Sequence, residues 1–197
     1  MSYREAAKYV VAYFFFWAGM GGITPFITRF ASEEIGMSEA ETYWVLLAFL
    51  VATAIFAVPA GWLGDRFGRK PVMAWALLAF AVLIFYGSQS TDRVVVIVVL
   101  ALAGIANAFT TVLAYPLFTV MVPPRRMGEL TGMSTMVWSL AQPLGATGFG
   151  ALADVTGTLR TVMMGGAASM VVALAVLLTV RVAAEERAAA APQPGLD

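Results

Sequence analysis

The chain has 197 residues, of which 60% are apolar and 12% charged, and its twelve basic residues balance twelve acidic ones. So few polar side chains cannot cover so much apolar surface, which excludes a soluble domain and predicts an all-α membrane protein. Cys and His are absent. Their absence excludes disulfides, thiolate nucleophiles and histidine-based metal or proton-relay sites, and the zero net charge indicates no nucleic-acid partner.

Six apolar runs follow one another along the chain, and each is long enough to cross a hydrocarbon core of about 30 Å as a helix. They cover approximately residues 9–30, 42–62, 71–89, 94–122, 130–152 and 161–181. Because the links between them are short, helices that are adjacent in sequence are expected to run antiparallel. The sequence therefore predicts a six-helix transmembrane bundle over residues 1–182 and a disordered cytoplasmic tail over residues 183–197.

The basic residues are distributed unequally between the two sides of this predicted bundle. One side carries nine: Arg4, Lys8, Arg66, Arg69, Lys70, Arg125, Arg126, Arg181 and Arg187. The other side carries only Arg29, Arg93 and Arg160. Because cytoplasmic loops are enriched in Lys and Arg, we expect both termini in the cytoplasm and a multi-pass protein of the plasma (inner) membrane.

A short motif occurs twice, at the end of the second and of the fifth predicted helix. The first copy reads Gly61-x-Leu63-x-Asp65-x-x-Gly68, and the second reads Gly150-x-Leu152-x-Asp154-x-x-Gly157. Three helices separate the two copies, so they face opposite sides of the membrane. This pattern predicts an inverted three-plus-three repeat, with repeats over about 9–89 and 94–181. The alternative is coincidence, because Gly, Leu and Asp are ordinary loop residues.

Polar and aromatic residues fall on single faces of the first, fourth and fifth predicted helices. These candidates for a substrate pathway are Tyr13, Trp17, Thr24, Asn107, Thr111, Tyr115, Ser134, Trp138 and Gln142. Interior prolines occur in the first, second, fourth and fifth helices, which we expect to surround the pathway, with the third and sixth outside. The alternative is that these polar groups only hydrogen-bond neighbouring helices.

The segment from Gly61 to Pro71 resembles the signature loop between the second and third helices of a half in the major facilitator superfamily of transporters. Residues 123–132 and 150–154 are similar to the segments that precede and end the fifth helix of such a half. The resemblance implies a gating role for Gly61, Asp65, Arg66, Gly68, Arg69 and Lys70. It also implies contacts between halves through Arg125, Arg126, Gly128, Glu129, Thr131 and Gly132. The alternative is that the basic segment only sets topology.

Members of this superfamily usually contain two halves and twelve helices, whereas this chain resembles one half. We therefore expect a second copy or a complementary six-helix half as partner, together with membrane lipid and a small-molecule substrate. The resemblance implies solute transport by alternating access, with no cofactor, no metal and no enzymatic activity. A non-transporting membrane scaffold, or a fragment of a longer twelve-helix transporter, is the alternative.

Overall fold

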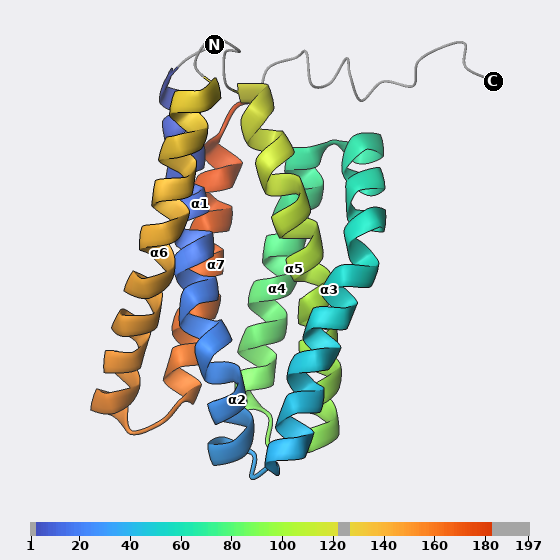
Figure 1. Ribbon diagram of the computed structural model, residues 1–197, viewed down its shortest axis with the longest axis vertical. Coiled ribbons are helices and arrows are strands. Elements are labelled where there is room, and N and C mark those ends of the chain that lie inside the picture. Colours follow the sequence, from blue (N-terminus) through green and yellow to red (C-terminus); the bar gives the residue numbers. More distant parts are fainter. Residues whose placement is uncertain (1–2, 122–126, 183–197) are drawn as a thin grey trace, which may run out of the picture.

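The computed structural model describes residues 3–121 and 127–182, which form helices joined by short links and contain no β-strand (Figure 1). In chain order the helical elements are α1 (Tyr3–Ile23), the 3₁₀ turn η1 (Thr24–Phe26), α2 (Ile27–Arg29), the π-helix η2 (Phe30–Glu34), α3 (Glu39–Phe67), α4 (Arg69–Gln89), α5 (Arg93–Met121), α6 (Met127–Thr156) and α7 (Arg160–Thr179). The expectation of an all-α protein is confirmed for these residues.

Five helical segments in the described residues are long and apolar enough to cross a membrane. They are the combined segment from Glu5 to Glu34, and α3, α4, α5 and α7. The fifth predicted span, residues 130–152, falls within α6, which has 30 residues but is not among the five. Helices long and apolar enough to cross a membrane are therefore present at five of the six predicted positions, and the fifth predicted span, within α6, stays a prediction.

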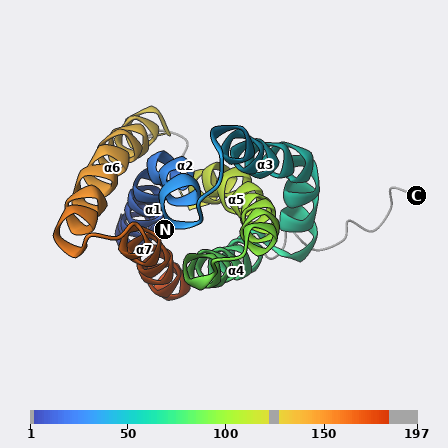
Figure 2. The same cartoon turned by 90° about the horizontal axis from the view of Figure 1, so that it is seen from below.

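The helices pack as two sets of three. In one set α1 lies against α6 and α7, and in the other α5 lies against α3 and α4. The contact between α4 and α7 joins the two sets. Viewed from below, α1 and α5 occupy the middle of the bundle, with α3 and α6 toward one side and α4 and α7 toward the other (Figure 2).

Glycines allow the backbones to approach closely within each set. A Cβ atom on Gly145 of α6 would overlap the carbonyl oxygen of Ala18 in α1, and one on Gly104 of α5 would overlap that of Phe49 in α3. Small residues at helix crossings are the usual means of packing helices in a membrane, where lipid tails are as apolar as the side chains. The closest pairs are therefore α1 with α6 and α3 with α5.

The interior prolines lie in four helical segments, and one of them, Pro25, coincides with irregular backbone. Pro25 lies in η1, where the first predicted span changes from α-helix to 3₁₀-helix, and the same span ends as the π-helix η2. Pro59, Pro116 and Pro143 lie inside α3, α5 and α6. Because proline removes a backbone donor and crowds the preceding turn, these four helices are the ones expected to bend.

The basic segment 61–71 differs from the loop expected between the predicted spans 42–62 and 71–89. It is helical except at Gly68, so that α3 runs to Phe67 and α4 begins at Arg69. Gly68 reverses the chain alone, with φ 92° and ψ 134°, a conformation open to glycine because it lacks a Cβ atom. Pro71 lies in the first turn of α4, where a missing N–H costs no helical hydrogen bond. One glycine therefore replaces the expected loop.

Candidate functional site

We call the end of the bundle that carries Arg66, Arg69 and Lys70 the basic end, and the opposite end, with Glu34, Ser88 and Arg160, the far end. The start of α1 and the end of α7 both lie at the basic end (Figure 1). The charged side chains of the described residues lie near helix ends, and none of them is among the buried polar side chains. This placement is the one that a membrane imposes.

At the basic end, the carboxylate of Asp65 is paired with Arg69 rather than with Arg66. The Arg69 guanidinium lies 3.0 Å from Asp65 Oδ1 and also donates to the carbonyl oxygen of Pro116 in α5 at 3.3 Å. The guanidinium of Arg66 instead lies over two rings, at 5.2 Å from the centroid of Trp62 and 5.6 Å from that of Phe67. Asp65 keeps 68% of its side chain exposed, so it stays accessible to a partner.

Lys70 joins the start of α4 to the end of α7. Its ammonium group donates to the carbonyl oxygens of Leu178 at 3.2 Å and Val180 at 2.5 Å. The last carbonyls of a helix have no partner within it and carry negative partial charge, so a cation is favourable there. Lys70 therefore holds α4 and α7 together at the basic end.

The two glycines that end the motif copies both have a left-handed backbone. Gly68 has φ 92° after α3, and Gly157 has φ 71° after α6. Gly64, inside the first copy, fits against α5 so closely that a Cβ atom would overlap the side chain of Leu113. A Cβ on Gly61 would meet only Val112, at 3.9 Å. The motif glycines thus serve chain reversal and helix packing.

The far end contains a polar cluster that the sequence analysis did not identify. Glu34 of η2 accepts from the Thr158 hydroxyl at 2.6 Å and the Leu159 backbone N–H at 2.8 Å, and its carboxylate lies 3.4 Å from Arg160. Arg160 also donates to the carbonyl oxygen of Ser88, near the end of α4, at 2.5 Å. The available signal was the position of Arg160, three residues after Gly157.

Four of the predicted pathway residues come together between α1 and α6. The ring centroid of Trp17 lies 5.9 Å from that of Tyr13 and 5.7 Å from that of Trp138, both in edge-to-face geometry. Ser134, one turn before Trp138 in α6, interacts with the Tyr13 hydroxyl. The indole N–H of Trp17 is buried beside the Tyr13 hydroxyl but forms no well-aligned hydrogen bond among the described residues. We call this set, Tyr13, Trp17, Ser134 and Trp138, the aromatic group.

Asn107 lies apart from the aromatic group, at the contact between α5 and α3. Its side chain is 7% exposed; Nδ2 is 3.4 Å from the hydroxyl of Thr53, and Oδ1 has no partner among the described residues. Thr53 was not among the predicted residues, and its hydroxyl also donates to the carbonyl oxygen of Gly104 at 2.9 Å. The Thr111 hydroxyl donates to the Asn107 carbonyl oxygen at 2.7 Å, so it needs no ligand.

The remaining predicted pathway residues lie outside these two sets. Thr24 and Tyr115 are exposed, and Tyr115 has 55% of its surface accessible. Gln142 is half-buried, and its backbone lies so close to α1 that a Cβ atom on Gly21 would overlap it. The structure therefore joins only part of the predicted pathway within one chain.

The segment predicted to contact another half is described only from its helical part. Arg125 and Arg126 lie outside the described residues. Gly128, Glu129 and Gly132 are exposed at the start of α6. Thr131 is half-buried, and its hydroxyl is without a hydrogen-bond partner in the described part of the chain. The exposed residues Gly128, Glu129 and Gly132 are therefore open to contact, whereas the Thr131 hydroxyl is buried.

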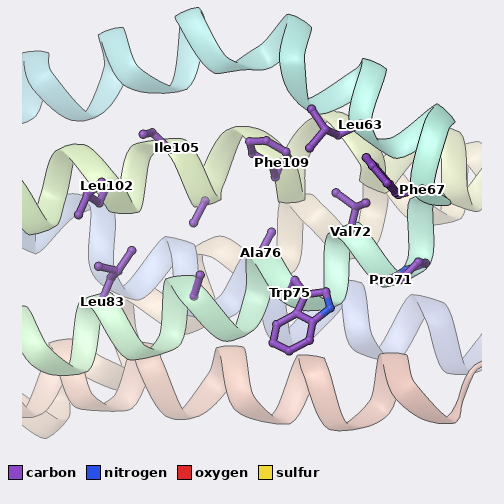
Figure 3. A pocket seen from close by; sticks show the side chains of 12 residues that line it. Leu63, Phe67, Pro71, Val72, Trp75, Ala76, Leu83, Leu102, Ile105 and Phe109 are labelled. Atoms are coloured by element: carbon purple, nitrogen blue, oxygen red, sulfur yellow. The ribbon is translucent and has the colours of Figure 1, made fainter.

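A large cavity lies on a different side of the bundle from the aromatic group. It has a volume of about 610 Å³ and is lined by α3, α4 and α5, with Phe67, Trp75 and Phe109 among its lining residues (Figure 3). Its lining is almost entirely apolar. None of the predicted pathway residues contributes to it.

The comparisons with known proteins agree with the helical arrangement. The chain is 31% identical to the MFS-type transporter YceJ of Bacillus subtilis (strain 168), over 63% of this chain and 32% of that protein. It is 29% identical to the fosmidomycin resistance protein of Escherichia coli (strain K12), over 70% of this chain and 33% of that protein. It is also 28% identical to the tetracenomycin C resistance and export protein of Streptomyces glaucescens, over 54% of this chain and 19% of that protein.

The matched segment spans about a third or less of the length of these relatives. Their names support membrane transport as the class of function. The family model of the Major Facilitator Superfamily matches residues 9–196, which is nearly the whole chain. The motif at 61–71, the membrane-spanning helices and this match agree, and the chain belongs to the Major Facilitator Superfamily.

Proposed function

We propose that the chain forms one six-helix half of a secondary transporter that moves a small solute by alternating access. The observation that carries this proposal is the aromatic group between α1 and α6. It places a buried indole N–H without a well-aligned hydrogen bond beside Trp138, which is 39% exposed. Such groups are unfavourable against lipid and suit the wall of a polar pathway. A single half supplies one wall only.

The packing of the helices supports an inverted repeat of about 9–89 and 94–181. The set of α1 with α6 and α7 has the same arrangement as the set of α5 with α3 and α4. Both motif copies end on a left-handed glycine. The helices that follow them, α4 and α7, are joined reciprocally: Lys70 at the start of α4 donates to carbonyls at the end of α7, and Arg160 at the start of α7 donates to a carbonyl at the end of α4. In this proposal α6 is the fifth of six spans, and both termini are cytoplasmic.

The partner completes the pathway and gives Asp65 a second role. Asp65 is exposed and bound only by Arg69 among the described residues, so its carboxylate can reach the start of α6 in a partner half. A helix start carries unpaired N–H groups and positive partial charge, which favour an anion. Contacts of this kind would close the basic end and would break when the pathway opens there. The partner is a second copy or a complementary half.

The substrate that this wall favours is small and uncharged or weakly polar. Aromatic rings and neutral hydrogen-bonding groups line it, and no carboxylate lies among the predicted pathway residues. Two relatives are named for resistance to fosmidomycin and to tetracenomycin C. Small antibiotics therefore belong in the panel of solutes to be tested, together with sugars.

Transport by the reconstituted chain tests this function directly. We expect Asp65→Asn to reduce solute flux about tenfold, because the lost charge at a helix start is worth about 1.4 kcal/mol. Asp154→Asn is the matched control, since it changes the corresponding position of the second motif copy. Equal flux in wild type and Asp65→Asn would leave the basic segment with a role in topology alone. Absence of flux for every solute in the panel would support the scaffold or fragment reading.

Cross-linking tests the identity of the partner. The variants Asp65→Cys and Thr131→Cys are placed in two copies that carry different tags, in a chain that has no other cysteine. A disulfide between differently tagged copies requires Cα atoms about 7 Å apart or closer, and it would support the second copy as partner. Failure to cross-link, with flux restored only by a separate six-helix chain, would indicate a complementary half.

A further inference from the structure

The cavity between α3, α4 and α5 runs along one half of the bundle, beginning at the basic end. Phe67 and Pro71 line it where α3 passes into α4, and Leu83 and Leu102 line it furthest from that point (Figure 3). Along α4 the lining extends from Pro71 to Leu83, which corresponds to about 18 Å at 1.5 Å per residue. One leaflet of a hydrocarbon core of about 30 Å is about 15 Å deep. The cavity therefore has the depth of one leaflet.

The lining chemistry excludes a polar ligand. Among the twelve lining residues, the indole of Trp75 provides the one polar side-chain group. Burying a hydroxyl or a charge without a hydrogen-bond partner is unfavourable, so neither a sugar nor an ion fits. Phe67 and Trp75 are 62% and 70% exposed, so the cavity opens on the outer surface of the helices. A flexible hydrocarbon chain is the ligand that this shape and chemistry favour.

A cation lies at the mouth of the cavity. The Arg66 guanidinium is 5.6 Å from the ring centroid of Phe67, a lining residue, and 5.2 Å from that of Trp62. Arg69, the neighbouring cation, is already paired with Asp65. No carboxylate pairs with Arg66 in the part of the chain that the structure describes. Arg66 therefore has its charge available for an anion, at the level where lipid headgroups begin.

We propose that this cavity is a binding site for one anionic phospholipid. One acyl chain lies in the cavity, and the phosphate group binds Arg66 at the basic end. Helices α3 and α4 each pack closely on α5 but contact each other little. The lipid fills the space between them. Helices α3 and α5 both contain interior prolines and are therefore able to bend. The bound acyl chain supports them from the outer surface of the bundle.

Quenching of tryptophan fluorescence by brominated lipid tests the proposal, since Trp75 lines the cavity. The full chain is placed in phosphatidylcholine nanodiscs with small fractions of brominated phosphatidylglycerol or brominated phosphatidylcholine. The signal of Trp75 is the difference between wild type and Trp75→Phe. We expect half-quenching at about fivefold lower mole fraction for the anionic lipid, which corresponds to about 1 kcal/mol for one cation near the surface.

Two variants and their matched controls separate the acyl and the headgroup contacts. Ala79→Phe fills the cavity and should abolish selective quenching, whereas Leu78→Phe, on the same helix outside the lining, should preserve it. Arg66→Gln should remove the preference for the anionic lipid, whereas Arg93→Gln at the far end should keep it. Circular dichroism and gel filtration show that each variant is folded.

Three results would overturn the proposal. Equal quenching by both lipids in wild type would remove the anion site, and unchanged quenching in Ala79→Phe would place the acyl chain elsewhere. Displacement of the lipid by an uncharged apolar dye, with the same affinity in wild type and Arg66→Gln, would identify a site for apolar small molecules instead. Because no solute flux is measured, these results are independent of the proposed transport function.

Discussion

The two motif copies, one at each end of the bundle, share a backbone design but use their charges differently. Each ends on a left-handed glycine, and each is followed by a helix, α4 or α7, whose first turn carries a cation. The cation of α4 binds carbonyls at the end of α7, and the cation of α7 binds a carbonyl at the end of α4. At the far end, Arg160 and Glu34 also bind each other, so that segments distant in the sequence are joined within the chain. At the basic end, the carboxylate of Asp65 faces solvent.

This difference indicates that the far end stabilises the half itself, whereas the basic end makes contacts outside it. Glu34 is 21% exposed and has three partners, which makes it a structural residue of the half itself. Asp65 is 68% exposed and contributes little to the stability of the half, because an exposed ion pair within one helix turn is weak. The far end is thus satisfied internally, while the basic end retains a charge for contacts outside the half.

Substitution of Glu34 should have the largest effect. Glu34→Ala leaves the Leu159 N–H and the Thr158 hydroxyl without their acceptor and removes the ion partner of Arg160. We expect a loss of about 2 kcal/mol in the free energy of unfolding, because hydrogen bonds to a charged group are worth about 1.5–3 kcal/mol. This loss corresponds to a decrease of about 4–8 °C in the thermal midpoint measured by circular dichroism in detergent.

Glu33→Ala is the matched control for this prediction. Glu33 is adjacent in sequence, but its one ion-pair partner among the described residues is Arg29, which lies one turn away and has 57% of its side chain exposed. The thermal midpoint of this variant should equal that of wild type, and Asp65→Ala should resemble it. An equal decrease in Glu34→Ala and Asp65→Ala would contradict the division between the ends.

Substitution of the two glycines should have an intermediate effect at both ends. Gly68→Ala and Gly157→Ala each place a Cβ atom on a backbone with positive φ, which costs about 1–2 kcal/mol in the free energy of unfolding. Gly68→Ala should reach the upper end of this range, because ψ 134° also takes Gly68 away from the left-handed helical region that other residues can enter, whereas the Pro71 ring 3.4 Å away is only in ordinary contact. Chemical unfolding of both variants measures the difference.

Gly128→Ala provides the control for the glycine substitutions. Gly128 lies in α6, where its Cβ would meet no atom within 4 Å. Alanine is favoured over glycine in a helix by about 1 kcal/mol. This variant should therefore be at least as stable as wild type. Destabilisation of Gly128→Ala to the level of Gly68→Ala would show that positive φ is not the cause.

The arrangement of elements could be predicted from the sequence to a large extent. Five of the expected spans appear in the structure as membrane-spanning candidates, and the interior prolines lie in the elements assigned to them. Apolar length and proline position are local properties, so one sequence is enough to read them. The error at 61–71 had a local cause too: charges suggested a loop, but the Asp65–Arg69 pair is compatible with helix, and Gly68 alone suffices for the reversal.

The candidate site could be predicted only in part, because its contacts depend on how distant helices meet. The spacing of Tyr13 and Trp17 indicated one face of a helix, and the structure confirms their proximity. The roles of Thr53 and Glu34 depend on partners far away in the sequence, Asn107 and Arg160, and no local pattern indicates such pairs. The cavity likewise results from the packing of three helices, while its lining residues look like ordinary apolar span residues.

Substitution of Lys70 should have the smallest effect and completes the comparison of the two ends. Lys70→Met keeps the apolar part of the side chain but removes the cation from the last carbonyls of α7. We expect a loss of about 0.3–1 kcal/mol in the free energy of unfolding, the usual range for a charge at a helix end. Arg160→Met should cost more, because it also removes the partner of Glu34. Loss of stability in Lys70→Met that equals or exceeds that in Arg160→Met, in the same unfolding experiment, would show that the basic end is fastened as firmly as the far end. The basic end would then be unsuited to opening during transport.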